Sequence, residues 1–172
     1  MTERYISEVA SPIGTIAMVI DGGALEVLDF RDDNGRFDAL VRRLCPAGVR
    51  RSASDPSGIT DRIAAYFEGE LGAICDIETR PSGTAFQQSV WQALRSIPCG
   101  STIAYRELAN RVGNPRANQA VGQANGRNPV AIVLPCHRVI GADGSLTGYG
   151  GGLERKAWLL RHEGAIDQHR DA

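Results

Sequence analysis

The chain has 172 residues, of which 42% are hydrophobic and 23% are charged, and its formal net charge is −1. This is ordinary globular composition for one large domain or two small ones, which excludes wholesale disorder. The first eight residues are polar and no apolar run approaches the ~18 residues of a membrane span. We therefore expect a cytoplasmic protein with no signal peptide and no membrane contact.

The small net charge hides an asymmetry between the two halves of the chain. Residues 1–83 carry 14 acidic and 9 basic side chains, a net −5, whereas residues 84–172 carry 6 acidic and 10 basic, a net +4. This division predicts that a polyanion docks on the C-terminal half. Uneven surface charge is also common at this size and would give the same pattern.

The cysteines argue against a metal centre. They form no C-x-x-C pair and have no clustered histidine partners, which disfavours a zinc site or a disulfide scaffold and predicts reduced thiols. The four are Cys45, Cys75, Cys99 and Cys136.

The N-terminal part is predicted to be a small structural domain, residues 1–80, of sheet and helices. Three runs separated by turns predict an antiparallel meander: Tyr5–Val9, Thr15–Ile20 and Leu25–Phe30. Helical spacing follows over 37–44 and 59–67, with a loop over 46–58 between them, and we expect a further strand over Ile74–Ile77. This half shows no catalytic constellation.

A linker is predicted at residues 81–83, followed by a second domain over 84–166 and a tail over 167–172. Thr84-x-x-Gln87 is a capping-box pattern and predicts that a helix begins there and ends before Pro98.

Two further helices are predicted to form a helix-turn-helix. The first covers Tyr105–Arg111, with Gly113 as the glycine that caps its C-terminus. The second runs from about Arg116 to Asn125. The second helix of such a motif can enter a DNA groove, and small and amide residues on an exposed face allow close approach. The residues expected on its outer side are Asn118, Gln119, Ala120, Gly122 and Gln123. A helix pair packed tightly inside the domain would show the same pattern.

A possible nucleophile follows. Pro135-Cys136-His137-Arg138 comes directly after the apolar run 131–134, which predicts a buried strand. A lone cysteine is more often buried and inert than reactive. Here the adjacent imidazole favours the thiolate, which is the form that attacks.

Longer motifs surround this tetrapeptide. They are Gly83-Thr84-x-Phe86-Gln87-Gln88-x-Val90-Trp91-x-Ala93-Leu94, Gly144-x-Leu146-x-Gly148-Tyr149-Gly150-Gly151-Gly152 and Leu159-Leu160-x-x-Glu163-Gly164. With Pro135-Cys136-His137-Arg138-Val139-Ile140-Gly141 they resemble, in order over residues 83–164, the O6-alkylguanine-DNA alkyltransferases, also called methylated-DNA–protein-cysteine methyltransferases. The resemblance implies an α/β (α+β) fold, with a ribonuclease-H-like N-terminal domain and a mostly helical C-terminal domain containing a winged-helix-like helix-turn-helix.

The resemblance also implies an activity and its residues. O6-alkylguanine, and O4-alkylthymine, would be flipped out of double-stranded DNA, and Cys136 would accept the alkyl group once and irreversibly. His137 is implied to remove the thiol proton through a water and Glu163 to fix the imidazole. Tyr105 is implied to meet the charge that develops on the departing guanine. No metal or organic cofactor is implied, and we expect a monomer in solution.

Several of these roles have plainer alternatives. Glu163 would otherwise be a solvated carboxylate at a helix end, Tyr105 a half-buried core aromatic, and Asn128, implied to brace the loop before the nucleophile, part of an ordinary Asn-Pro turn. Arg138 is either structural or directed at phosphate. The pocket walls implied are Pro135, Val139, Tyr149 and Gly150. The DNA-binding residues implied are Arg116, Ala117, Asn118, Gln119, Ala120, Gly122 and Gln123.

Three positions depart from the family pattern. Gln119 stands where the recognition helix usually carries an arginine, so we predict weaker or slower base extrusion with the chemical step intact. Asn118 replaces a usual alanine, and Cys99 replaces a usual tyrosine.

Two other functions are considered. A non-enzymatic binder of alkylated DNA could use the same scaffold, but relatives of that kind lack the acceptor cysteine. A cysteine hydrolase or acyl-transfer enzyme could use Cys136, His137 and Glu163, but it would turn over and would need an oxyanion hole. A permanent adduct on Cys136 distinguishes alkyl transfer from both.

Overall fold

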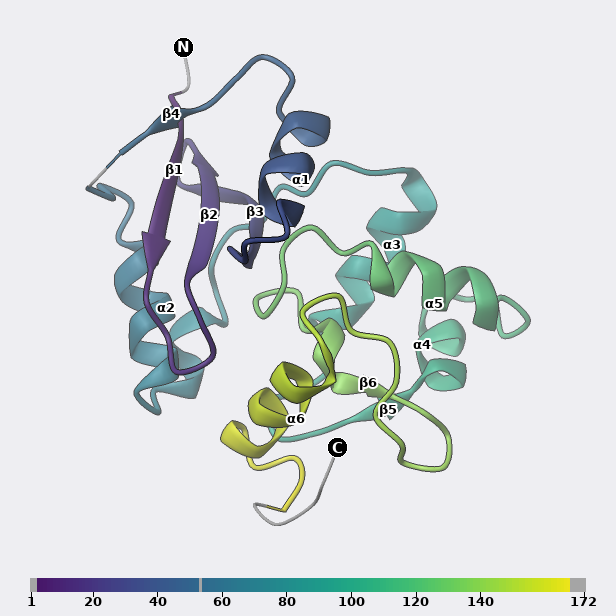
Figure 1. Ribbon diagram of the computed structural model, residues 1–172. Helices are drawn as coiled ribbons and strands as arrows, with labels where there is room; N and C mark the ends of the chain where they lie inside the picture. Colours follow the sequence, from purple (N-terminus) through teal and green to yellow (C-terminus); the bar gives the residue numbers. More distant parts are fainter. Residues whose placement is uncertain (1–2, 53, 168–172) are drawn as a thin grey trace. The chain divides into compact units, whose positions relative to one another are not determined.

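The computed structural model describes residues 3–52 and 54–167, and the chain divides into two compact units, Met1–Ser82 and Gly83–Ala172 (Figure 1). Nearly all of the expected tail, residues 168–172, lies outside the described residues. Over the described ranges, no helix is both long enough and apolar enough to cross a membrane.

The first unit is built on a four-stranded sheet in the order β3-β2-β1-β4. Its first three strands are β1 (Arg4–Val9), β2 (Ile16–Asp21) and β3 (Ala24–Phe30), and their antiparallel pairing confirms the predicted meander. Gly22 and Gly23 connect β2 to β3 with φ of 57° and 80°, the positive values that a tight two-residue hairpin turn requires. The two-residue strand β4 (Arg50–Arg51) pairs parallel with β1, inside the segment predicted to be a loop.

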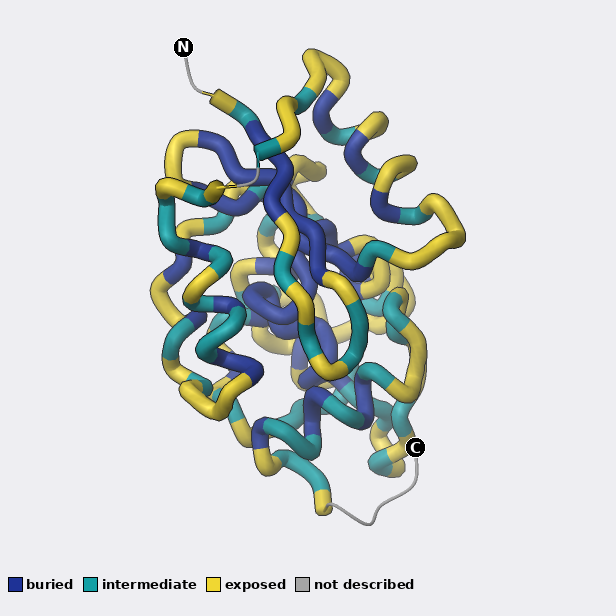
Figure 2. Tube along the Cα trace, turned by 60° about the vertical axis from the view of Figure 1, so that its left-hand side comes forward, coloured by how far each residue is buried: buried dark blue, intermediate teal, exposed yellow. Residues whose placement is uncertain are grey.

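Two helices follow the meander, α1 (Arg36–Leu44) and α2 (Ile59–Phe67), close to the predicted bounds. The apolar side of α1 packs on one face of the sheet. The hydrophobic cluster between α1 and the sheet contains the buried residues Ile6, Ala17, Val19, Val27, Phe37, Val41 and Cys45. The intervening residues of β2 are buried as well, so both faces of this strand are covered (Figure 2).

The predicted strand over Ile74–Ile77 is wrong. The chain instead forms a 3-10 helix, η1 (Leu71–Ile74), and then a turn. The cause is local hydrogen bonding, because the Cys75 N–H donates to Gly72 O and the Ile77 N–H to Ile74 O. Within the part of the chain that the structure describes, this segment pairs with the sheet through one bridge, between Thr79 and Leu25.

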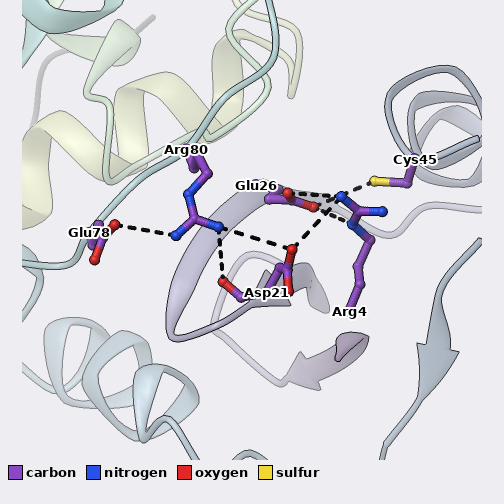
Figure 3. A network of polar contacts seen from close by, with 6 residues as sticks. All are labelled: Arg4, Asp21, Glu26, Cys45, Glu78 and Arg80. Carbon is purple, nitrogen blue, oxygen red and sulfur yellow. Dashed lines mark hydrogen bonds and ion pairs between the residues drawn. The ribbon is translucent and has the colours of Figure 1, made fainter. Parts of the chain in front are cut away.

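A polar network lies beside the turn between β2 and β3, where β1 begins (Figure 3). Arg4 donates to both carboxylate oxygens of Glu26, with Nε to Oε2 at 2.6 Å, and Arg4 and Arg80 each lie within 4.0 Å of Asp21 Oδ2. The Cys45 thiol donates toward Glu26 Oε2 at 3.9 Å.

The second unit is mainly helical, with a two-stranded parallel sheet. Its elements are α3 (Ala85–Leu94), β5 (Ile103–Ala104), α4 (Tyr105–Arg111), α5 (Asn118–Gly126), η2 (Cys136–Arg138), β6 (Val139–Ile140) and α6 (Leu153–His162). The Thr84–Gln87 capping box is present at the start of α3, as predicted. Helix α5 begins two residues later than predicted because Ala117 closes a turn onto Asn114 O.

The buried strand predicted over 131–134 is also wrong. These residues are buried, but they form a turn in which the Leu134 N–H donates to Val130 O and the Val133 N–H to Ala131 O. Ile132 has a φ of 73° at the centre of the three-residue turn that the Val133 N–H and Ala131 O close, a strained conformation that costs a non-glycine residue roughly 1–3 kcal/mol. An apolar run specifies burial but not an extended backbone, and here the local hydrogen bonds are satisfied within the turn.

Candidate active site

The turn before Cys136 is closed by one asparagine. The Val130 N–H donates to Asn128 Oδ1 at 3.0 Å, and Asn128 Nδ2 donates to Leu134 O at 2.7 Å. Asn128 therefore ties the two ends of the turn together and sets where the chain enters η2. Strain of the kind seen at Ile132 persists where the surroundings hold the backbone in place, and it gathers at functional sites.

Cys136 is the first residue of η2 and is only 6% exposed. Its carbonyl oxygen accepts a hydrogen bond from Asn125 Nδ2 at 3.4 Å, and Asn125 belongs to the last turn of α5. The segment that carries the thiol is thus linked directly to α5. Sequence reasoning did not single out Asn125.

His137 and Glu163 form a buried pair. Glu163 lies at the C-cap of α6, and its Oε2 is 3.0 Å from His137 Nε2, with both side chains fully buried. Burial lowers the pKa of His137, and the charges of Arg138 and Lys156 lower it further against the opposing effect of Glu163. The imidazole is therefore neutral near pH 7, and its second nitrogen, Nδ1, has no hydrogen-bond partner among the described residues.

Arg138 shares the same carboxylate. Its Nε donates to Glu163 Oε1 at 2.8 Å and its Nη2 to Oε2 at 2.9 Å, a bidentate pair, while Nη1 donates to Ile97 O at 2.8 Å. Burial alone would raise the pKa of Glu163, but the hydrogen bonds from Arg138 and His137 hold it well below its usual range. Of the two roles that the sequence left open for Arg138, the buried ion pair favours the structural one.

Lys156 is the charged residue that sequence reasoning missed. It is fully buried on α6, and its Nζ donates to Val139 O at 2.6 Å and to Thr147 O at 2.7 Å. Burial lowers the pKa of Lys156 to about 8, while the negative charge of Cys136 acts in the opposite direction. A signal was present in the sequence, because Lys156 falls on the same helical stripe as the buried Leu159 and Leu160.

Tyr105 begins α4 and is half-buried. Its hydroxyl donates to Thr147 O at 3.3 Å, so Tyr105 and Lys156 hold the same backbone carbonyl. A side chain in place of Gly122 would come within 3.8 Å of the Tyr105 ring, and one in place of Gly148 within 3.5 Å of its hydroxyl. Tyr105 therefore lies between α5 and the loop of residues 141–152.

The implied pocket residues lie on the segments next to Cys136. Pro135 and Val139 are buried on either side of η2, and Val139 O is one of the two acceptors of Lys156. Tyr149 is half-buried and Gly150 is exposed, both on the loop that precedes α6. Pro135 and Val139 thus flank η2 in the chain, and Lys156 binds the carbonyl of Val139. Tyr149 and Gly150 belong to the loop whose Thr147 carbonyl Lys156 also binds.

The implied DNA-binding residues form the exposed side of α5 and the turn before it. Val121 and Ala124 face the core, and Ala124 O accepts a hydrogen bond from the buried Trp91 ring at 2.9 Å. Gly122 is half-buried and Ala117 is the N-cap. The exposed residues are Arg116, Asn118, Gln119, Ala120 and Gln123.

The arrangement is suited to nucleophilic chemistry. A neutral imidazole beside a buried thiol can take its proton, and a carboxylate can hold the resulting imidazolium. Within the residues that the structure describes, no group of three or more histidine, cysteine, aspartate or glutamate side chains is arranged to hold a metal ion.

The chain is similar to known proteins over nearly its whole length. Residues 85–165 match the family model described as "6-O-methylguanine DNA methyltransferase, DNA binding domain". A methylated-DNA–protein-cysteine methyltransferase of Salmonella typhimurium is 48% identical over 167 residues, which cover 95% of this chain and 98% of that protein. The crystal structure of Mycobacterium tuberculosis OGT in complex with DNA aligns with a TM-score of 0.80 at 42% identity, over 94% of this chain and 93% of that one. The O6-methylguanine-DNA methyltransferase of Pyrococcus kodakaraensis aligns with a TM-score of 0.70 at 30% identity, over 94% of this chain and 99% of that one.

Proposed function

The chain belongs to the methylated-DNA–protein-cysteine methyltransferases, and from that premise we propose that it removes O6-alkylguanine from duplex DNA by a single irreversible transfer to Cys136. The observation that carries the proposal is the buried constellation of Cys136, His137 and Glu163. The base is rotated out of the stack, because an alkyl group on O6 is not accessible to a thiol inside a duplex.

The proton path follows from which imidazole nitrogen is engaged. Glu163 accepts from His137 Nε2, so Nδ1 is the nitrogen left to receive a proton. The thiol proton of Cys136 passes to Nδ1 through a water, and the sulfur forms a bond to the alkyl carbon. The bond between that carbon and guanine O6 breaks with its electron pair on the purine, which then takes up a proton.

The leaving group needs a donor for its developing negative charge. Tyr105 supplies the hydroxyl, which in the free protein rests on Thr147 O. Pro135, Val139, Tyr149 and Gly150 wall the pocket for the flipped base, and Asn128 keeps the nucleophile segment in place.

DNA is bound through α5. Small and amide side chains on its exposed side allow the helix to lie in a groove, and Gln119 stands at the position from which the family's arginine fills the gap left by the extruded base. Glutamine can hydrogen-bond to the orphaned partner base, but it has no charge and a poorer stacking surface. We expect slower base extrusion than an arginine would give.

Intact-mass spectrometry tests the main proposal. Mixing the protein with a duplex oligonucleotide that contains one O6-methylguanine should add one methyl group, and peptide mapping should place it on Cys136. Continued turnover with no adduct would support a cysteine hydrolase, and tight binding with neither adduct nor turnover would support a damage-binding protein. A duplex containing O4-methylthymine should give the same adduct.

The Gln119 hypothesis needs a separate measurement. Single-turnover repair of duplex substrate should be faster in Gln119→Arg than in the natural chain, whereas repair of a single-stranded substrate should be unchanged. Equal duplex rates and equal duplex affinities in the two proteins would overturn it.

The same proposal includes the fold class and limits of each domain, the oligomeric state and the location of the protein. These are the ribonuclease-H-like class of the first unit, the winged-helix-like class of the second, the domain limits 1–80 and 84–166, a monomeric state and a cytoplasmic location. Gel filtration tests the monomeric state.

A further inference from the structure

The carboxylate that orients the catalytic imidazole is also the partner of a buried cation. Glu163 Oε2 accepts from both His137 Nε2, at 3.0 Å, and Arg138 Nη2, at 2.9 Å. The guanidinium also holds Oε1, so both oxygens of the carboxylate are fixed in one plane. The position of the imidazole therefore depends on Arg138 through Glu163.

Arg138 is itself anchored. Its Nη1 donates to the carbonyl oxygen of Ile97 at 2.8 Å, and the residue is 7% exposed. A guanidinium is always protonated in proteins, so this positive charge is permanent. Since Ile97 follows α3, one side chain connects the chain after α3, the end of α6 and the nucleophile segment.

The charge on Arg138 has a consequence for the base. A lone buried carboxylate at 3.0 Å would favour the imidazolium, because opposite charges at short range stabilise one another. An imidazole that is already protonated cannot accept the thiol proton. Burial disfavours the charged ring, and the Arg138 charge offsets that of Glu163, so the carboxylate can orient the ring without favouring its protonated form.

We propose that Arg138 is a positioning residue that keeps His137 neutral and correctly oriented by holding and partly neutralising Glu163. This inference rests on the proposed function for the role of His137 as the base. Arg138 exerts this effect through Glu163 and takes no direct part in bond making or bond breaking.

The other charges around the imidazole agree with this assignment. Glu163 and Lys156 act on it from the α6 side, and Arg138 and Cys136 belong to η2 with His137. Helix α3, which also packs against η2, has no ionisable side chain within Ala85–Leu94. Among the described residues, Glu163 is thus the carboxylate that acts on the ring, and Arg138 is a cation bonded to it.

The inference can be tested without DNA. The His137 imidazole is titrated by NMR in the natural chain, in Arg138→Gln and in Arg138→Lys. Glutamine keeps a donor for Glu163 but removes the charge, so the imidazole should take up its proton at a pH at least about one unit higher. Lysine keeps the charge but not the two-pronged contact, and its imidazole should titrate as in the natural chain.

Single-turnover methyl transfer from an O6-methylguanine duplex supplies the second readout. In Arg138→Gln the acid limb of the rate should move to higher pH with the imidazole, and a limb displaced by one pH unit should lower the rate there about tenfold. In Arg138→Lys the rate should fall at every pH, because orientation is lost while charge is retained. Arg62→Met is the matched control, since Arg62 also holds a carbonyl, Ala73 O, and a carboxylate, Asp76, but in the first unit.

The outcomes separate the inference from the proposed function. An unchanged imidazole titration in Arg138→Gln, or an equal displacement in Arg138→Lys, overturns the inference. If Arg138→Gln does not fold, Arg138→Lys still decides, because a displaced titration in that variant contradicts the role assigned to charge. Absence of any methyl adduct in the natural chain overturns the proposed function and leaves the NMR result to stand by itself.

Discussion

Each unit contains a buried cysteine near an arginine–glutamate ion pair, Cys45 with Arg4 and Glu26, and Cys136 two residues before Arg138 (Figure 3 shows the first). Both sites combine a buried thiol with an arginine–glutamate ion pair, but the neighbours of the two sulfur atoms differ. Burial raises the pKa of Cys45, and the Glu26 carboxylate, 3.9 Å from its sulfur, raises it further. This thiol stays protonated.

Cys136 has the opposite arrangement. Its sequence neighbour is a neutral imidazole whose Nδ1 can receive a proton, and the nearby buried cation is Lys156, whose pKa responds to the charge on Cys136. The carboxylate of this cluster is engaged by the imidazole and the guanidinium. We therefore propose that the placement of charge, rather than burial or the presence of an ion pair, makes Cys136 the nucleophile and leaves Cys45 inert.

The largest difference between the two cysteines should appear on substitution. Cys136→Ser should abolish the methyl adduct completely, because the hydroxyl is a far weaker nucleophile at neutral pH. Cys45→Ser should leave the amount and rate of adduct formation unchanged. Intact-mass measurements on both variants check this, and a loss of transfer in folded Cys45→Ser would contradict the comparison.

Removing the cation should reduce the reactivity of Cys136. Lys156→Met keeps the length of the side chain but removes its charge and its hydrogen bonds to Val139 O and Thr147 O. We expect single-turnover transfer at pH 7 to fall about tenfold, the effect of one unit in the protonation equilibrium of the thiol. Arg4→Met, which removes the cation near Cys45, should leave the rate unchanged.

The buried His137–Glu163 pair should make the protein sensitive to acid. His137 has a lowered pKa, so the unfolded chain takes up its proton first and stability falls as the pH drops below about 6.5. Glu163 also has a lowered pKa, so its stabilisation is present above about pH 4.3 and is lost on further acidification. Each of these two groups lowers the free energy of unfolding by roughly 1.4 kcal/mol per pH unit within its own pH range.

Denaturant unfolding between pH 7 and 4 measures this loss. His137→Gln should flatten the decline that begins near pH 6.5, because glutamine does not titrate. A decline of the same steepness in His137→Gln and in the natural chain would assign the acid sensitivity to other groups. Asp55, whose pKa the hydrogen bonds of Ser57 and Tyr5 lower, is a carboxylate of the first unit that contributes only in the more acid window.

The smallest effect is expected at the edge of the first network. The Arg80 side chain is half exposed, and its contacts to Asp21 and Glu78 are 3.4 to 4.0 Å long. Arg80→Met should change the free energy of unfolding by at most about 1 kcal/mol and should not affect transfer. A loss of several kcal/mol in denaturant unfolding would show that this network supports the first unit more strongly than its exposure suggests.

The sequence predicted well where the signals are local. The bounds of α2 and α4, the capping box at Thr84 and the antiparallel meander follow from side-chain periodicity and turn residues within a few positions of one another. It failed at residues 131–134 and at Ile74–Ile77, where apolar composition indicates burial but local turn hydrogen bonds decide the backbone.

The sequence by itself determined the family, because the family depends on motifs with fixed spacing. The same motifs predict which residue is the nucleophile and which helix faces DNA. Only the tertiary structure decided which charges meet. Arg138 and Glu163 are 25 positions apart, and Lys156 reaches the carbonyl of Val139 across 17. Periodicity places such residues on a buried face, but charge compensation in a buried site is decided by atoms within about 3 Å, which only the folded chain brings together.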